Sequence, residues 1–247
     1  MEKFLEDIGE RKEQAKSVYN NESFEAPLYL DFASGKLIAA SDIGSSRLGR
    51  NEDRVIVCPE TSSFAVIDGM GGYGNGYQMA DVLKEELLKE MCGAINERDT
   101  HRMHVRASMK MKKYSMANNT SDGGAAYVVC KYYKRELVVA RAGDVSVCVV
   151  NSKGDEINKL DTTSLRDCPT VFNPGVPKID NLNCFGGSTI VLGSDGFWDN
   201  IKIDDVRDIV STHNLKDSFD ELYRKVKESL NAEFGKKDNV SLVLFRV

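Results

Sequence analysis

The chain has 247 residues, of which 41% are hydrophobic and 29% charged, and its formal net charge is −5. This length suits one domain, or a domain with an appendage, and is enough to bury a substantial core. The negative charge argues against nucleic acid as the main partner. No apolar run approaches the roughly 18 residues that a membrane span needs. We therefore expect neither a nucleic-acid partner nor a membrane partner.

The amino-terminal residues and the cysteines both favour a cytoplasmic location. Residues 1–16, MEKFLEDIGERKEQAK, are charged where a secretory signal peptide would be apolar. The six cysteines include no CxxC pair, and several lie within apolar runs. That pattern is typical of buried thiols in a reducing compartment. With only three histidines, we do not expect a His-rich zinc hydrolase site.

The first half of the chain alternates strand-like and helix-like patterns. Residues 1–20 predict a short helix with weak periodicity, and residues 28–40 predict a hairpin around Ser34 and Gly35. Residues 41–50 read as a loop, residues 54–58 as a strand and residues 64–67 as a buried strand. Residues 77–96 place apolar side chains on one helical face.

A second helix is predicted over residues 98–113, where a basic residue recurs at every fourth position. On a helix this spacing forms a basic stripe, which comprises Arg98, Arg102, Arg106 and Lys110. We expect the stripe to be a solvated face. The alternative is a docking surface for an acidic or phosphorylated partner.

The second half of the chain is richer in strands. Residues 125–133, 136–143 and 145–150 predict consecutive strands with short links, which implies an antiparallel sheet. Residues 161–187, with three prolines, predict an irregular surface loop. A strand over 188–193, helices over 203–213 and 218–234, and a closing strand over 239–247 follow. This order supports an α+β fold.

Four aspartates stand beside the β-rich runs. Asp53 precedes one strand, Asp68 ends the buried strand, Asp195 ends another, and Asp238 opens the last. One such residue is typical of a turn, but the recurrent pairing with strand ends indicates a shared metal site. Glycines follow Asp68 directly, beginning with Gly69, and let an ion approach the backbone closely. Carboxylate and carbonyl oxygens are the ligands that hard cations prefer.

Five short motifs containing these acids occur in a fixed order. They are RLGRNED at 47–53, DGMGG at 68–72, GD at 143–144, SDG at 194–196 and DN at 238–239. In this order and context they resemble the metal-dependent protein phosphatase family, the type 2C Ser/Thr phosphatases, over roughly residues 38–247. The resemblance implies two antiparallel β-sheets stacked face to face, with a helix pair on each outer side. Residues 1–37 are then an N-terminal extension with a short helix and a strand, and residues 38–247 the catalytic domain.

The resemblance also implies an activity. A water molecule bridging two divalent ions, Mn²⁺ or Mg²⁺, would hydrolyse phosphoserine or phosphothreonine in a protein substrate. The direct ligands implied are the side chains of Asp68, Asp195 and Asp238 and the carbonyl of Gly69. Asp68 would bridge both ions, Asp53 would act through bound water, and Glu52 would orient those waters. We expect the protein to be a monomer.

The residue that receives the phosphate departs from the family pattern. An arginine fork matches phosphate oxygens, and the family places it five residues before the position of Asp53, which here is Leu48. Arg47 lies one residue earlier and would serve through a one-residue bulge, which we expect. Arg50 is the alternative.

Other functions also fit parts of the sequence. Gly69-x-Gly71-x-x-Gly74 satisfies a dinucleotide-binding fingerprint, but Asp68 would repel a pyrophosphate there. The displaced arginine, and Val145 where the family usually has a serine, leave open a catalytically impaired phosphatase-like regulatory or binding module. A phosphatase for small molecules on the same fold is the third reading.

Overall fold

The computed structural model describes most of the chain. The described residues are 16–18, 27–45, 49–71, 75–91, 93, 95–120, 122–154, 157–160, 162–233 and 235–247, with the backbone alone at 16–18. Among these residues no helix is both long and apolar enough to cross a bilayer.

Within the described residues, twelve strands form two six-stranded sheets in which every strand pair is antiparallel. Sheet A has the order β1-β4-β5-β6-β7-β10, with bounds Lys16–Val18, Asp53–Cys58, Ser63–Met70, Gly124–Tyr133, Glu136–Ala142 and Lys178–Asn183. Sheet B has the order β2-β3-β12-β11-β8-β9, with bounds Leu28–Phe32, Gly35–Asp42, Val240–Arg246, Thr189–Gly193, Ser146–Val150 and Ile157–Lys159.

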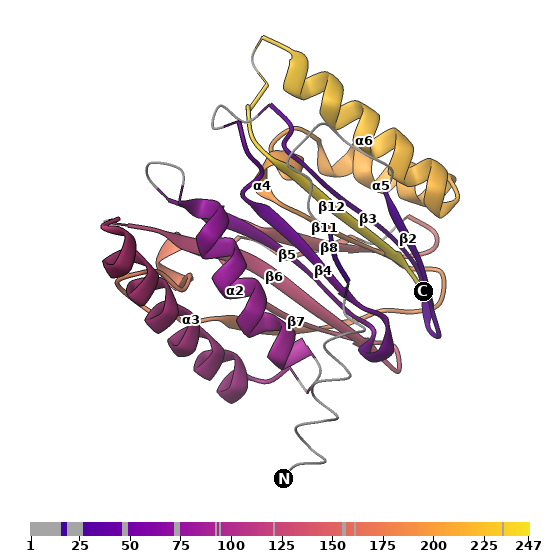
Figure 1. The fold of residues 1–247 in the computed structure, drawn as a ribbon. Helices are drawn as coiled ribbons and strands as arrows, with labels where there is room; N and C mark the ends of the chain where they lie inside the picture. Colours follow the sequence, from indigo (N-terminus) through magenta and orange to yellow (C-terminus); the bar gives the residue numbers. More distant parts are fainter. Residues whose placement is uncertain are drawn as a thin grey trace.

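Helices cover the outer face of each sheet, as Figure 1 shows. Sheet A is covered by α2 and α3, which span Gly76–Met91 and Glu97–Asn118. Sheet B is covered by α5 and α6, which span Ile203–Thr212 and Leu215–Asn231. The short helix α4 spans Asp195–Trp198, and two 3₁₀ turns, η1 and η3, span Pro59–Thr61 and Leu165–Asp167. The predicted fold, two stacked antiparallel sheets flanked by helix pairs, is therefore confirmed.

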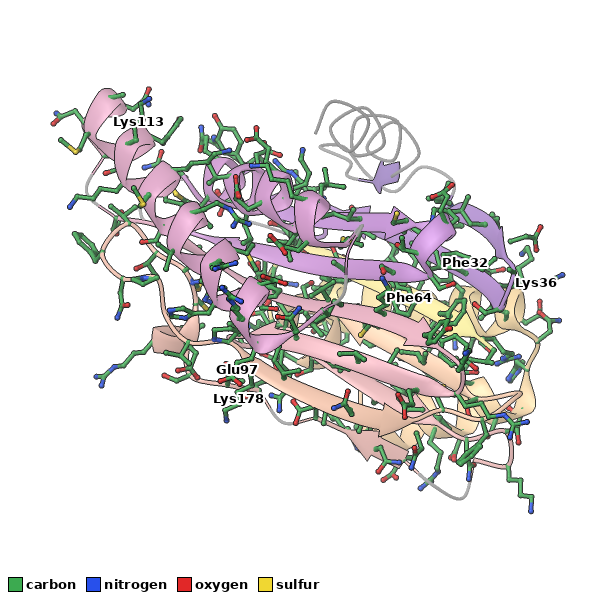
Figure 2. The ribbon with its side chains drawn as sticks, turned by 90° about the horizontal axis from the view of Figure 1, so that it is seen from below. Phe32, Lys36, Phe64, Glu97, Lys113 and Lys178 are labelled. Carbon is green, nitrogen blue, oxygen red and sulfur yellow. The ribbon has the colours of Figure 1, made fainter. Side chains whose placement is uncertain are left out.

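The alternation of side chains along β12 explains why the layers stack. Val243 and Phe245 face the core between the sheets, while Leu242 and Leu244 face α5 and α6. Successive side chains of a strand point to opposite faces, so the continuous apolar run 242–245 of β12 can fill two cores. Phe245 lies 5.2 Å, between ring centroids, from each of two phenylalanines of the inter-sheet core that are labelled in Figure 2, Phe32 and Phe64.

Several predicted elements differ in the structure. Lys16–Val18 form a strand, β1, that pairs with β4, not part of a helix; residues 1–15 and 19–20 lie outside the described part. β8 does not pair with β7 but joins sheet B, because periodicity does not say to which sheet a strand belongs. The predicted loop over 161–187 contains β10, which pairs with β7. Its largely exposed edge position gives it no apolar alternation to detect.

The predicted division of the chain at residues 37 and 38 falls inside β3. The hairpin of β2 and β3 was predicted, and it pairs through β3 with β12 in sheet B. Residues 28–37 are thus part of the sandwich. The role of the rest of the N-terminal extension stays a prediction.

The basic stripe is largely exposed, but two of its residues form ion pairs with α2. Arg106 pairs with Glu86 at 2.7 Å and also with Glu90, and Lys110 pairs with Glu85 at 3.0 Å and Glu86 at 2.9 Å. The Glu86 side chain is fully buried. The expected solvated face is borne out for the exposed Arg98, Arg102 and Lys110, and docking of a partner stays a prediction. The ion pairs with α2 could not be predicted, because periodicity does not reveal acids on a neighbouring helix.

Candidate metal centre

Two of the four aspartates face each other across one strand pair. Asp53 opens β4 and lies directly opposite Asp68 of β5 in the antiparallel register. Residues opposite each other in such a pair project to the same face, about 4.5–5.5 Å apart at Cβ. Asp53 is only 1% exposed. The two carboxylates are therefore held together by the sheet itself.

The other two aspartates meet where α4 crosses the start of β12. Asp195 is the first residue of α4, after β11, and Asp238 precedes β12. A Cβ on Gly196 would lie 1.8 Å from the carbonyl oxygen of Asn239 and 3.2 Å from the Cβ of Asp238. Only glycine permits so close a backbone approach. The SDG and DN motifs are thus joined in space by the glycine of the first.

Two serines connect this crossing to Asp53. The Ser194 hydroxyl accepts a hydrogen bond from the Ser241 N–H at 3.0 Å, and the Ser194 N–H donates to the Ser241 carbonyl at 3.2 Å. Both hydroxyls lie near enough to the Asp53 carboxylate to oppose the rise of its pKa on burial. The acids of the two sheets are therefore linked through a buried hydrogen-bonded seam.

The cluster gathers several acids in a buried place, and the pKa values of Asp53 and Asp68 are raised there. Burial, followed by the charges of Asp53, Asp195, Asp144 and Asp238, raises the pKa of Asp68 well above its usual range. Burial also raises the pKa of Asp53 to about 7, against the lowering effect of the serine hydroxyls. Like charges that share a low-dielectric site disfavour ionisation. A bound cation would relieve this repulsion.

Unpaired oxygens of buried acids support a cation at this place. Within the described residues, Asp53 Oδ2, Glu52 Oε1 and Asp144 Oδ1 have no hydrogen-bond partner. A buried carboxylate oxygen without a partner is costly, and an all-oxygen donor set suits Mg²⁺ or Mn²⁺. No three Asp, Glu, His or Cys side chains of the described residues already stand in a ligating arrangement. The residues fit an ion in kind, and an ion would have to draw them together.

Glu52 and Gly69 meet at the N-terminus of α2. Burial raises the pKa of Glu52, against hydrogen bonds that its carboxylate accepts from the N–H groups of Tyr77 and Gly76. The Gly69 N–H donates to the Glu52 carbonyl at 3.2 Å. A Cβ on Gly76 would lie 2.3 Å from the Gly69 carbonyl oxygen, so glycine is required there. Glu52 thus caps the helix with one oxygen and leaves the other free.

The two candidate phosphate arginines have different outcomes. Arg47 lies outside the described residues. Arg50 lies over the ring of Tyr77, with 4.7 Å from its guanidinium carbon to the ring centroid. Such stacking leaves the edge of the guanidinium available for an anion.

A third arginine, Arg54, was not predicted from the sequence, and it holds the backbone of the segment that carries Asp53. Arg54 is 2% exposed and forms a two-point pair with Asp81 of α2 at 2.9 and 3.1 Å. It also donates to the carbonyls of Asn51 at 3.1 Å, Asp53 at 2.7 Å and Tyr77 at 3.2 Å. Its position beside Asp53 in the NED motif is the only signal the sequence offers.

Three further charged groups of the site were missed as participants. Asp144, noted only as part of the GD motif, is near enough to raise the pKa of Asp68. Asp199 lies four residues after Asp195, one helical turn on. Lys236, two residues before Asp238, lies 2.5 Å from Asp195 and 2.8 Å from Asp199.

Comparisons with known proteins agree with this arrangement. No family model matches the chain. A curated protein of Drosophila ananassae, protein phosphatase PTC7 homolog fig, is 23% identical over 264 aligned residues, which cover 87% of this chain and 78% of that protein.

Solved structures give the same fold at low identity. The Mycobacterium tuberculosis serine/threonine phosphatase PstP/Ppp matches with a TM-score of 0.72 and 16% identity, covering 89% of this chain and 99% of its own. PppA, a key regulatory component of T6SS in Pseudomonas aeruginosa, matches with a TM-score of 0.71 and 16% identity over 94% and 99%. The PstP catalytic domain in complex with 2 manganese ions matches with a TM-score of 0.70 and 16% identity over 85% and 96%.

The layered sheets and the acids gathered where their strands begin and end define the class of type 2C phosphatase-like sandwiches. The chain is similar to members of the metal-dependent protein phosphatase family and has their fold. The family resemblance stated from the motifs is thereby confirmed.

Proposed function

We propose that this protein is a metal-dependent serine/threonine protein phosphatase. The observation that carries the proposal is the convergence of acids from β4, β5, α4 and the start of β12, where burial and then the charges of the neighbouring acids raise the pKa of Asp68. Bound Mn²⁺ or Mg²⁺, two ions per site, would supply an activated water and clamp the phosphoryl oxygens. The ligand set proposed is Asp68, Asp195, Asp238, the Gly69 carbonyl and, through water, Asp53.

The protein's own groups have separate tasks in this proposal. Asp68 is held opposite Asp53 by strand register, so the two carboxylates would face the ions from the same side of the sheet. Glu52 keeps an unpaired oxygen that orients water. Because the backbone of these groups is held by strands and by the start of α2, an ion has only to draw their side chains together.

Recognition of the phosphate falls to an arginine. Arg50 is preorganised by its stacking on Tyr77, and Arg47 remains the other candidate. Removal of a single preorganised charge donor commonly costs about 10²-fold in turnover. Comparing Arg50→Met with Arg47→Met therefore identifies the phosphate ligand.

The wider setting is also a proposal. The family relation supports a phosphorylated protein as substrate. We infer a cytoplasmic protein without a nucleic-acid or membrane partner from the composition, and we expect a monomer. The five described cysteines are all buried free thiols, which fits a reducing compartment.

The test is phosphate release from a phosphothreonine peptide and from an aryl phosphate, with Mn²⁺, with Mg²⁺ and with EDTA. We expect metal-dependent hydrolysis, abolished in Asp195→Asn, and a preference for the peptide. Equal or better turnover of small phosphates would point to a small-molecule phosphatase. A wild-type protein that binds Mn²⁺ but hydrolyses nothing would point to a regulatory module, a reading favoured by the engagement of Asp195 with Lys236.

A further inference from the structure

A lysine ammonium lies inside the acid cluster. Lys236 Nζ lies 2.5 Å from Asp195 Oδ2 and 2.8 Å from Asp199 Oδ2. The side chain of Asp195 is 16% exposed and that of Asp199 52%. Two carboxylates one helical turn apart, facing the same point, form the kind of place where a hard cation binds. Here a cation of the chain itself stands between them.

The backbone of Lys236 is fixed where this contact requires it. The buried Asn200 donates from Nδ2 to the Lys236 carbonyl at 3.1 Å and to the Gly196 carbonyl at 2.9 Å, and its Oδ1 accepts from Ser229 at 2.9 Å. A Cβ on Gly235 would lie 1.9 Å from the Ser229 carbonyl oxygen, so this segment lies directly against α6. One buried amide thus ties together α4, α6 and the segment that presents the ammonium.

The pairing divides the oxygens of Asp195 between two tasks. Oδ2 is held by Lys236, which leaves Oδ1 for an ion shared with Asp68 and Asp238. Asp199 Oδ2 is held by the same ammonium. An ammonium carries one positive charge and three N–H donors, so it offsets one of the two carboxylate charges.

We propose that Lys236 is a tethered cation of the metal centre: it takes the position between Asp195 and Asp199 that a further divalent ion would otherwise occupy, and it orients Asp195 through Oδ2. The inference rests on the proposed function only in that it requires the acid cluster to bind divalent ions. Lys236 is a positioning residue, which limits the number of ions and sets the geometry of one ligand.

The test counts ions rather than turnovers. Mn²⁺ binding to the full-length protein is measured by equilibrium dialysis and calorimetry for wild type, Lys236→Met and Lys227→Met. Lys227 is an exposed residue of α6, so its variant removes the same charge without touching the cluster. We expect Lys236→Met to bind one further Mn²⁺ per chain and Lys227→Met to match wild type. The additional ion should disappear in Lys236→Met combined with Asp199→Asn.

A second variant keeps the test decisive if Lys236→Met does not fold. In the wild-type background Asp199→Asn removes only a partner of Lys236, so the number of bound ions should stay unchanged. Loss of an ion in Asp199→Asn would show that a metal, not the lysine, occupies this position and would overturn the inference. An unchanged ion count in folded Lys236→Met would overturn it equally. A protein that binds Mn²⁺ as expected here but lacks phosphatase activity refutes the proposed function alone.

Discussion

Replacing Arg54 by methionine tests whether the acid cluster depends on a buried charged support. The guanidinium pairs with Asp81 through two hydrogen bonds of 2.9 and 3.1 Å and donates to three backbone carbonyls. Methionine keeps most of the buried aliphatic volume and removes every donor. The change therefore isolates the polar contribution of Arg54 from its packing.

The size of the stability loss follows from the polar groups that Arg54→Met leaves without a donor. Removing one partner of a buried ion pair costs about 3–5 kcal/mol, but the side chain of Asp81 is 41% exposed and retains Lys84 at 2.7 Å. Most of the cost therefore comes from the carbonyls of Asn51 and Asp53, at about 1–3 kcal/mol for each buried carbonyl that loses its donor. The Tyr77 carbonyl adds little, because it lies in the first turn of α2 and also accepts a helical hydrogen bond. We expect Arg54→Met to lower the free energy of unfolding by about 3–5 kcal/mol.

The matched variant is Asp81→Asn, which leaves Arg54 with its three carbonyls and should cost about 1 kcal/mol. Equilibrium unfolding in urea, followed by far-UV circular dichroism in EDTA, measures both. The reasoning would be refuted by a loss below about 1 kcal/mol in Arg54→Met, or by a loss in Asp81→Asn larger than the loss in Arg54→Met. Since Arg54 holds the Asn51–Asp53 segment, Mn²⁺ affinity should also fall, by about 10–100-fold.

Three further predictions concern charge and pH. Burial lowers the pKa of His104 to about 4 from 6.5. The stability that the neutral imidazole contributes is therefore complete above pH 6.5 and is lost as the pH falls toward 4. In urea titrations over that pH range, wild type should lose about 3 kcal/mol more than His104→Gln. Burial would raise the pKa of Glu86, but hydrogen bonds from Lys89, Arg106 and Lys110 outweigh it and lower the pKa to about 2. Glu86→Gln should therefore cost about 2 kcal/mol at pH 7, a difference that narrows as the pH falls from 4.5 toward 2; equal stability at pH 7 would contradict the buried network. Asp68→Asn should raise the free energy of unfolding in EDTA by about 1 kcal/mol, because it relieves repulsion with neighbouring acids. The variant should also lose the stabilisation that Mn²⁺ gives wild type in thermal melts. A variant less stable than wild type in EDTA would contradict repulsion among the acids.

The layered fold was largely predictable because its signals are local. β5 contains the apolar run 64–67, which ends at Asp68, and β12 begins two residues after Asp238. Helices such as α6 keep a regular apolar face. What periodicity could not supply was the partner of each strand. The route from β7 to β8 turns at Gly143, whose φ is +92°, and leads to the other sheet, and nothing in the alternation of either strand marks that crossing.

The candidate site divides in the same way. Asp53, Asp68, Asp195 and Asp238 could be named because each sits at a strand end within a recurring motif. Lys236 could not, since a lysine two residues from an acid is ordinary in sequence and acquires meaning only when α4 is brought beside it. Arg54 was hidden for the related reason that its acidic partner lies on α2, 27 residues away.

The central claim is that this cluster of acids binds divalent ions for phosphate hydrolysis. Its most direct test is the rate of phosphate release from a phosphothreonine peptide as a function of Mn²⁺ concentration, for wild type beside Asp68→Asn, with both proteins shown to be folded. The account predicts a saturable, EDTA-reversible rate in wild type and none above background in the variant. A rate that does not depend on the metal, or that survives in Asp68→Asn, would contradict it.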